Sequence, residues 1–141
     1  MSDDTRYERG VSVDAGTAAR AWVEAWTKGW PAKDAGLIAS RYLPDAQYRS
    51  HPFREPTTAL AYTSWAFEDQ RELRFWFGEP VVGAGRAVVE YWAIITGADG
   101  RHVTIAGTSV LRFTPDGLVE DHRDYWAERE GAVEPPPGFG V

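Results

Sequence analysis

The sequence predicts one α+β domain in which three helices pack on a strongly curved antiparallel or mixed sheet. Residues 14–70 are dominated by helical periodicity, whereas residues 71–130 alternate polar and apolar side chains between turns. No repeat or linker divides the 141 residues, a length that suffices to bury one core. The chain contains no cysteine, so the fold must be stable without disulfides.

The first predicted helix spans residues 14–30, where apolar residues recur at intervals of three and four. Its apolar stripe consists of Ala18, Ala19, Trp22, Val23, Trp26 and Trp30. Gly29 and Pro31 are expected to end this helix. The stripe suits either a plain core or the wall of a cavity, because each buried indole N–H needs an acceptor.

Two further helices and one short strand are predicted before residue 70. The second helix covers residues 32–42 and ends before Pro44. Its inner side is expected to carry Leu37, Ile38, Arg41 and Tyr42. A strand over residues 46–50 is closed by Pro52, which also forces the preceding residue to be extended. A threonine at 57 or 58 is a suitable N-cap for a third helix that runs to about residue 70.

The second half of the chain is predicted to be an antiparallel meander. Its strands are expected over residues 71–77, 86–96, 101–113 and 117–126. Asp-Gly pairs at 99–100 and 116–117 are typical of the hairpin turns between the last three strands. We expect residues 1–13 to form a flexible arm, residues 14–130 the domain, and the Pro/Gly-rich residues 131–141 an extended tail.

The last predicted strand contains the residues best suited to chemistry. Strand alternation places Glu120, His122, Asp124 and Trp126 on one face, and Val119, Asp121, Arg123 and Tyr125 on the other. An imidazole beside a carboxylate, with an indole next in line, suits proton transfer in an aromatic pocket. The alternative is a charged edge strand whose side chains are solvated.

Composition excludes several classes of function. The net charge is −6 and the basic residues are not clustered, which argues against nucleic acid or an anionic membrane as a partner. The three histidines are scattered without ligand spacing, and no glycine-rich phosphate loop follows a strand, so we expect neither a metal nor a cofactor. No apolar run reaches the ~20 residues of a membrane span, and the N-terminus is not signal-like, so a cytoplasmic location is expected.

The aromatic content is high, with seven Trp, six Tyr and six Phe. Such a content fits either a large apolar cavity or a subunit interface. The expected partner is therefore a small apolar or aromatic organic molecule, a second subunit, or both.

Three segments resemble a known family: YRSHPF at 48–53, GTSVLRFTPDG at 107–117 and VEDHRDYW at 119–126. Together with the order of elements, they resemble the SnoaL-like branch of the NTF2-like superfamily over roughly residues 14–130. That superfamily includes polyketide cyclases, ketosteroid isomerases and limonene-type epoxide hydrolases. The resemblance implies a cone-shaped sheet that encloses a pocket, but it fixes no reaction because the fold hosts many chemistries.

The resemblance can be carried over only at particular positions. Arg123-Asp124-Tyr125-Trp126 is similar to the end of the last strand in the epoxide hydrolases, which implies that Asp124 faces the pocket. Those enzymes carry an Arg and a second Asp where this chain has Tyr91 and Ala93, so we do not expect epoxide hydrolysis. The ketosteroid isomerases carry an Asp base before a proline, where this chain has His51.

The resulting site hypothesis is cofactor-independent acid/base catalysis of isomerase or cyclase type on an apolar cyclic or polyketide-like substrate. Asp124 and His122 are predicted as a general acid/base pair, and Tyr48 as a donor to a developing oxyanion. The predicted substrate-binding residues are Trp26, Ser50, His51, Trp65, Tyr91, Ile105, Gly107 and Trp126. The alternative for Asp124 is an internal salt bridge to Arg54 or Arg112.

A second class of function is a non-catalytic ligand-binding or dimerisation module. The outer face of the sheet is predicted to carry Val88, Glu90, Trp92, Ile94, Thr104 and Val110. Exposed Trp92 and Ile94 would favour aggregation unless a partner covered them, so a homodimer is expected with or without catalysis.

Overall fold

A computed structural model describes residues 12–141 and shows one six-stranded sheet with three helices. The elements are α1 (Ala15–Ala32), α2 (Ala35–Ala39), β1 (Tyr42–Arg49), α3 (Ala59–Ala66), β2 (Gln70–Phe77), β3 (Val81–Gly83), β4 (Arg86–Gly97), β5 (His102–Phe113) and β6 (Val119–Glu130). The strand order is β1-β6-β5-β4-β2, with β3 paired to β4. The predicted α+β class is confirmed; most of the predicted arm, residues 1–11, lies outside the described residues.

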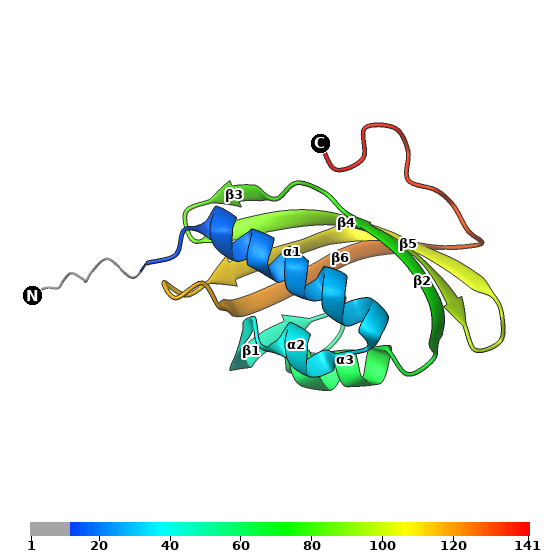
Figure 1. Ribbon diagram of the computed structural model, residues 1–141, viewed down its shortest axis with the longest axis horizontal. Helices are drawn as coiled ribbons and strands as arrows, with labels where there is room; N and C mark the ends of the chain where they lie inside the picture. Colours follow the sequence, from blue (N-terminus) through cyan, green and yellow to red (C-terminus); the bar gives the residue numbers. More distant parts are fainter. Residues whose placement is uncertain (1–11) are drawn as a thin grey trace, which may run out of the picture.

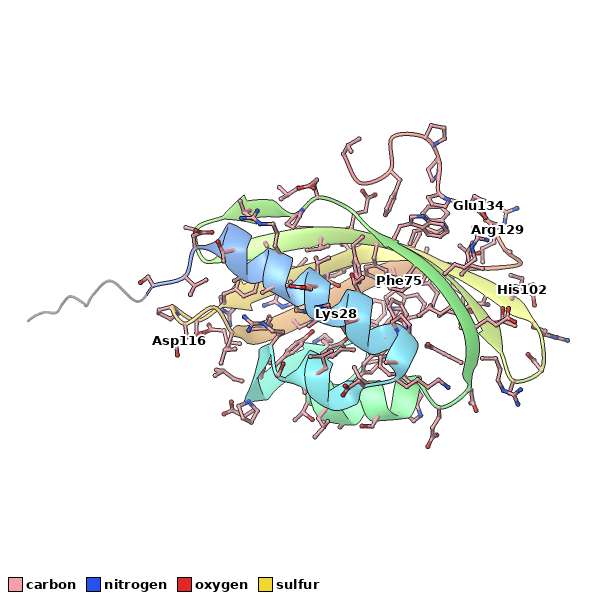
Figure 2. All side chains as sticks on the ribbon, viewed as in Figure 1. Lys28, Phe75, His102, Asp116, Arg129 and Glu134 are labelled. Carbon is pink, nitrogen blue, oxygen red and sulfur yellow. The ribbon has the colours of Figure 1, made fainter. Side chains whose placement is uncertain are left out.

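The helices lie on one side of the sheet, which curves around α1 (Figure 1). At the end of α1, the Trp30 ring packs against Phe75 of β2 with ring centroids 5.2 Å apart, and Figure 2 labels Phe75 near this end of the helix. β1 pairs in parallel with β6 at one edge of the sheet, whereas the other neighbours are antiparallel. In the described residues, no helix is long and apolar enough to cross a membrane.

Helix α1 carries the predicted apolar stripe and ends slightly later than expected. The Asp14 side chain caps its start by accepting a hydrogen bond from the Thr17 backbone N–H at 2.7 Å. Pro31 lies inside the last turn instead of stopping the helix, which ends at Ala32 and is capped by Lys33 in the left-handed conformation with φ 53°. The proline is tolerated there because the helix ends one residue later, so few backbone bonds are affected.

The predicted second helix is corrected by the structure. It ends at Ala39, and Tyr42 begins strand β1 instead of completing a helical turn. Pro44 lies inside this strand, at a place where the pairing with β6 shifts register between Tyr42 and Gln47. An edge strand with irregular pairing can hold a proline because no ladder hydrogen bond is needed from it. The structure therefore moves Tyr42 from a helix onto the sheet.

The third predicted helix begins as expected and ends early. The Thr58 hydroxyl accepts from the Ala61 N–H at 3.2 Å, which confirms the N-cap. The helix closes at Ala66, and the chain is already in strand β2 at Gln70. The helix therefore has 8 residues, and β2 begins four positions after its last residue.

A β-bulge changes the predicted alternation in β6. Arg112 of β5 pairs with Asp121, but the next residue, Phe113, pairs with Val119, so Glu120 has no opposite residue. Val119 consequently points inward and is fully buried, whereas Glu120 forms an ion pair with the Arg112 side chain at 2.7 Å. Glu120 thus does not share the inner face that the simple alternation assigned to it.

The C-terminal residues 131–141 pack against the outer face of the sheet, opposite the helices (Figure 1). The Gly131 carbonyl accepts from the Thr104 hydroxyl, and the Val133 carbonyl accepts from the Trp92 indole, each at 2.7 Å. Figure 2 shows Glu134 on this segment. The segment contacts Trp92, and Ile94 is only 4 % exposed, so the expected exposure of this face is corrected and the homodimer stays an untested prediction.

Candidate functional site

A cavity of about 290 Å³ lies between the helices and the inner face of the sheet. Five of the seven tryptophans line it: Trp22, Trp26, Trp30, Trp65 and Trp126. Three tyrosines, Tyr48, Tyr62 and Tyr91, also line the cavity. The ionisable lining residues other than tyrosine are Arg54, Glu68, Asp69, His122, Asp124 and Glu128. The wall is thus aromatic, with a few polar groups, as is typical of small-molecule sites.

Asp124 of β6 is the buried carboxylate of this cavity, with 7 % of its surface exposed. Its Oδ1 accepts from the Ser109 hydroxyl at 2.7 Å and lies 2.6 Å from His122 Nε2. The other oxygen, Oδ2, has no hydrogen-bond partner among the described residues and is not a fully enclosed atom. One carboxylate oxygen is therefore held in place, and the other opens into the cavity.

His122 is buried beside Asp124 and has partners on both ring nitrogens. Its Nδ1 lies 2.8 Å from the Tyr42 hydroxyl, and its imidazole stacks on the Tyr48 ring with centroids 3.9 Å apart. The Tyr42 hydroxyl also accepts from the indole N–H groups of Trp22 at 2.8 Å and Trp26 at 3.3 Å. Two indoles, a phenol, an imidazole and a carboxylate thus form one continuous buried chain of hydrogen bonds.

The tyrosines around the cavity are held in the protonated form. Burial raises the pKa of Tyr42, Tyr48 and Tyr91 well above the ordinary value, because the charged phenolate is poorly solvated. Burial raises the pKa of Tyr62 to about 12, and the negative charge of Asp124 acts in the same direction. At neutral pH these hydroxyls are therefore hydrogen-bond donors.

The salt-bridge alternative for Asp124 is not found among the described residues. Arg112 pairs with Glu120 on the outer side of the sheet. Arg54 donates to the Ser50 hydroxyl at 3.0 Å, and its guanidinium carbon lies 5.5 Å from the Trp126 ring centroid. Neither arginine forms an ion pair with Asp124, whose Oδ1 is held by the Ser109 hydroxyl and the His122 imidazole instead.

The structure brings most of the predicted site residues together in the cavity wall. The residues that line it are Trp26, Tyr48, Trp65, Tyr91, Ile105, His122, Asp124 and Trp126. Ser50, His51 and Gly107 are not part of the lining. The Ser50 carbonyl accepts from the Trp126 indole, the His51 ring packs edge-on against that indole at 5.0 Å, and Gly107 pairs with Trp126 across the sheet. All three therefore lie behind Trp126 and support it.

Several residues of the site are not among the predicted ones, and Tyr42 and Ser109 show why. The sequence predicts Tyr42 at the end of a helix that Pro44 closes, whereas the structure places it at the start of β1. Ser109 was visible only as an inward position in a strand, since alternation gives the face of a residue but not its partner across the sheet. The Ser109–Asp124 pair depends on the antiparallel register of β5 and β6, in which these residues lie directly opposite each other.

Metal ligands do not gather in the described part of the chain. Residues 12–141 contain no group of three or more His, Asp or Glu side chains arranged to hold a metal ion. The polar groups at Asp124 are instead joined to each other by hydrogen bonds.

Comparison with solved structures supports the fold. The epoxide hydrolase/cyclase-like enzyme SalBIII, described for pyran ring formation in the polyether salinomycin, matches with a TM-score of 0.66 and 16% identity, over 77% of this chain and 89% of that chain. An LEH-like epoxide hydrolase from M. tuberculosis matches with a TM-score of 0.62 and 17% identity, over 79% and 84%. A ketosteroid isomerase assigned by similarity in Kribbella flavida has a TM-score of 0.58 and 23% identity, over 89% and 87%.

These identities are low, so the structural neighbours establish the fold and not a reaction. A search of curated proteins finds no match. The SnoaL-like domain model matches residues 19–122, which cover most of the chain from α1 to the His122 position of β6. This protein therefore belongs to the SnoaL-like family.

Proposed function

We propose that this protein catalyses cofactor-independent proton transfer, of isomerase or cyclase type, on a small cyclic or polyketide-like ketone. The observation that supports the proposal most strongly is the environment of the Asp124 carboxylate. It is a buried carboxylate with one oxygen fixed by two partners and the other open to an aromatic cavity. A carboxylate held this way is pre-oriented as a general base.

In the proposed reaction, Asp124 Oδ2 removes a proton from the carbon next to a substrate carbonyl, and the C–H electron pair forms an enolate. In an isomerisation, Asp124 returns this proton to another carbon of the conjugated enolate. In a cyclisation, the enolate carbon attacks a second carbonyl, and the resulting alkoxide takes the proton from Asp124. Both routes return the carboxylate to its starting state, so neither consumes a second reactant.

The cavity tyrosines supply the stabilisation that an enolate needs. The hydroxyls of Tyr48, Tyr62 and Tyr91 belong to side chains that line the same cavity and stay protonated at neutral pH. Fixed donors aimed at a developing oxyanion commonly contribute about 3 kcal/mol each to transition-state stabilisation. These residues are the candidates for holding the substrate carbonyl.

The cavity also limits the size and chemistry of the substrate. Its volume of about 290 Å³ is near the lower end of ligand sites, which favours a molecule of one or two rings. The indoles of Trp26, Trp65 and Trp126 offer flat surfaces for such rings. Epoxide opening is disfavoured, because the positions where the resembling hydrolases carry an Arg and an Asp are occupied by Tyr91 and Ala93.

The proposal can be tested without knowing the natural substrate. We would incubate a small bicyclic ketone such as β-tetralone in D₂O and follow exchange at its acidic carbon by NMR. The wild-type protein is expected to accelerate exchange, and Asp124→Asn to remove the acceleration while ligand binding, measured by tryptophan fluorescence, persists. The matched control is Asp121→Asn, because Asp121 lies on the same strand but pairs with Arg123 on the outer side.

Each outcome separates the two classes of function. Exchange that survives in Asp124→Asn contradicts the role of this carboxylate. Binding of cyclic ketones by the wild-type protein without any accelerated exchange supports the alternative, a non-catalytic ligand-binding module of the same fold.

A further inference from the structure

The hydrogen-bond chain from Tyr42 to Asp124 determines where the protons lie. The Tyr42 hydroxyl can donate one hydrogen bond through its proton and accept two through its lone pairs. Two indole N–H groups, which can only donate, point to it from Trp22 and Trp26 at 2.8 and 3.3 Å. Both acceptor positions of the hydroxyl are therefore occupied.

The proton of the Tyr42 hydroxyl then has one possible destination among the described residues. Its remaining neighbour within hydrogen-bond distance is His122 Nδ1 at 2.8 Å. A proton on Nδ1 would point a third donor at the hydroxyl and leave its buried O–H without an acceptor, which is energetically unfavourable. Burial keeps the hydroxyl protonated, since it raises the pKa of Tyr42 well above its ordinary value. Nδ1 is therefore the acceptor.

The protonation of Nε2 follows from that of Nδ1. An imidazole whose Nδ1 is bare carries its proton on Nε2 and is neutral. Nε2 lies 2.6 Å from Asp124 Oδ1, so the N–H donates to this oxygen, which also accepts from Ser109. The reverse arrangement, in which a protonated Asp124 donates to Nε2, would require a proton on Nδ1 and is excluded by the same argument.

We propose that Tyr42 is a positioning residue that fixes His122 as the neutral Nε2–H tautomer, so that His122 orients Asp124 and does not itself transfer protons. The inference rests on the proposed role of Asp124 as the base. It revises the predicted acid/base pair to a single proton-carrying group. It also assigns the reacting atom, because Oδ1 receives two donors and only Oδ2 is free to take the substrate proton.

The geometry around the ring supports a fixed orientation. The Tyr48 ring stacks on the imidazole at 3.9 Å with planes 25° apart, and the Trp22 ring centroid lies 5.9 Å away. His122 is only 1 % exposed, so water does not compete for either ring nitrogen. The imidazole is thus held by contacts on its face and by hydrogen bonds on its edge.

The first test reads the tautomer directly and needs no substrate. We would label histidine with nitrogen-15 in a His51→Gln/His102→Gln protein, which leaves His122 as the single histidine. Long-range nitrogen–proton NMR spectra distinguish Nε2, which couples to both carbon-bound ring protons, from Nδ1. We expect an N–H chemical shift at Nε2 and a bare-acceptor shift at Nδ1. A proton found on Nδ1, or on both nitrogens, overturns the inference.

The second test determines whether Tyr42 is responsible for the Nε2–H tautomer of His122. Tyr42→Phe removes the donor that keeps Nδ1 unprotonated, so a proton should appear on Nδ1 in part of the molecules, and kcat for ketone exchange should fall at least about tenfold with little change in KM. Tyr48→Phe is the matched control for the tautomer alone and should keep the single Nε2–H form, because its ring contacts the same imidazole but its hydroxyl is outside the chain. A single Nε2–H tautomer in Tyr42→Phe contradicts the role of Tyr42.

A further variant tests the proton count at the Tyr42 hydroxyl. Trp22→Phe keeps the Tyr42 hydroxyl but removes its nearer indole donor, which frees one acceptor position. We expect a partial population of the Nδ1–H tautomer in this variant, and an unchanged tautomer contradicts the proton count. Failure of the proposed function appears as absent exchange with the tautomer intact, so the two claims fail separately.

Discussion

Gly107 of β5 and Trp126 of β6 face each other across the sheet too closely for any side chain at position 107. A Cβ on Gly107 would lie 2.6 Å from the Trp126 Cβ and 2.8 Å from its Cα, and closer still to the Tyr125 carbonyl. These are backbone or near-backbone atoms, which cannot move without displacing β6. The close approach sets the position of Trp126, and with it one wall of the cavity.

Replacing Gly107 by alanine is therefore expected to lower the free energy of unfolding by about 1–3 kcal/mol, as overpacking of a filled site usually does. Urea unfolding followed by circular dichroism measures this change. Gly83→Ala is the control, since a Cβ there meets nothing within 4 Å and the residue has no positive φ. Equal stability of the two variants contradicts the close contact.

Ser109 is expected to matter for catalysis through Asp124 alone. Ser109→Ala removes one of the two donors to Oδ1, which leaves the carboxylate free to rotate and share both oxygens with the cavity. A hydrogen bond to a charged group contributes roughly 1.5–3 kcal/mol, so the ketone exchange rate should fall about tenfold or more. The NMR exchange assay measures it, with Thr108→Ala, on the opposite face of the same strand, as control. Equal rates in both variants contradict a role for this hydroxyl.

The sequence predicted the general architecture because the relevant signals are local. The period of the α1 stripe, the Thr58 cap and the Asp-Gly turns depend on neighbouring residues, and the structure confirms them. The inward orientation of His122 and Asp124 follows from alternation in a single strand. These parts of the fold can be predicted without knowing which strands pair.

The features that the sequence does not predict depend on contacts between segments that are far apart in the chain. Tyr42 meets His122 only because β1 pairs in parallel with β6, 80 positions away in the chain, and no local pattern encodes that pairing. The bulge at Glu120 follows from a register shift between two strands. The packing of the C-terminal residues on the sheet depends on acceptors for the Thr104 and Trp92 side chains, which the composition of the tail does not reveal.

The buried tyrosines predict how stability depends on pH. In the unfolded chain Tyr62 loses its proton near the ordinary pKa of 10.0, but in the folded protein its pKa is about 12. The pKa values of Tyr42, Tyr48 and Tyr91 are also raised by burial. Above pH 10 the unfolded state therefore binds fewer protons than the folded state, and the free energy of unfolding falls as the pH rises. Well below pH 10 all four tyrosines are protonated in both states, so they do not make the free energy of unfolding depend on pH.

The measurement is a paired alkaline titration, with tyrosinate absorbance and circular dichroism recorded on the same samples. We expect the phenolate signal of these four residues to appear only together with the loss of secondary structure. Tyrosinate formation by all tyrosines near pH 10 in a protein that keeps its native spectrum contradicts the burial effect.

The C-terminal residues 131–141 are expected to stabilise the outer face of the sheet. Phe139 packs edge-on against Trp92 with centroids 6.0 Å apart, and the Gly140 N–H donates to the Glu90 carboxylate at 3.1 Å. A chain that ends after Glu130 would expose Trp92 and Ile94, and burying one such side chain contributes about 1.5–3 kcal/mol. We therefore expect truncation to lower the free energy of unfolding by about 2 kcal/mol or more.

The same truncation tests how the outer face relates to self-association. Exposed apolar residues on a sheet promote contacts between copies, so sedimentation should show more association in the truncated chain than in the intact one. Glu134→Ala is the control, because it removes only the exposed ion pair with Arg74, which is worth less than about 1 kcal/mol. If the truncated chain has unchanged stability and association, residues 131–141 do not cover this face in solution. If the intact chain is already a dimer, its interface must leave Trp92 to the C-terminal segment and use another part of the surface.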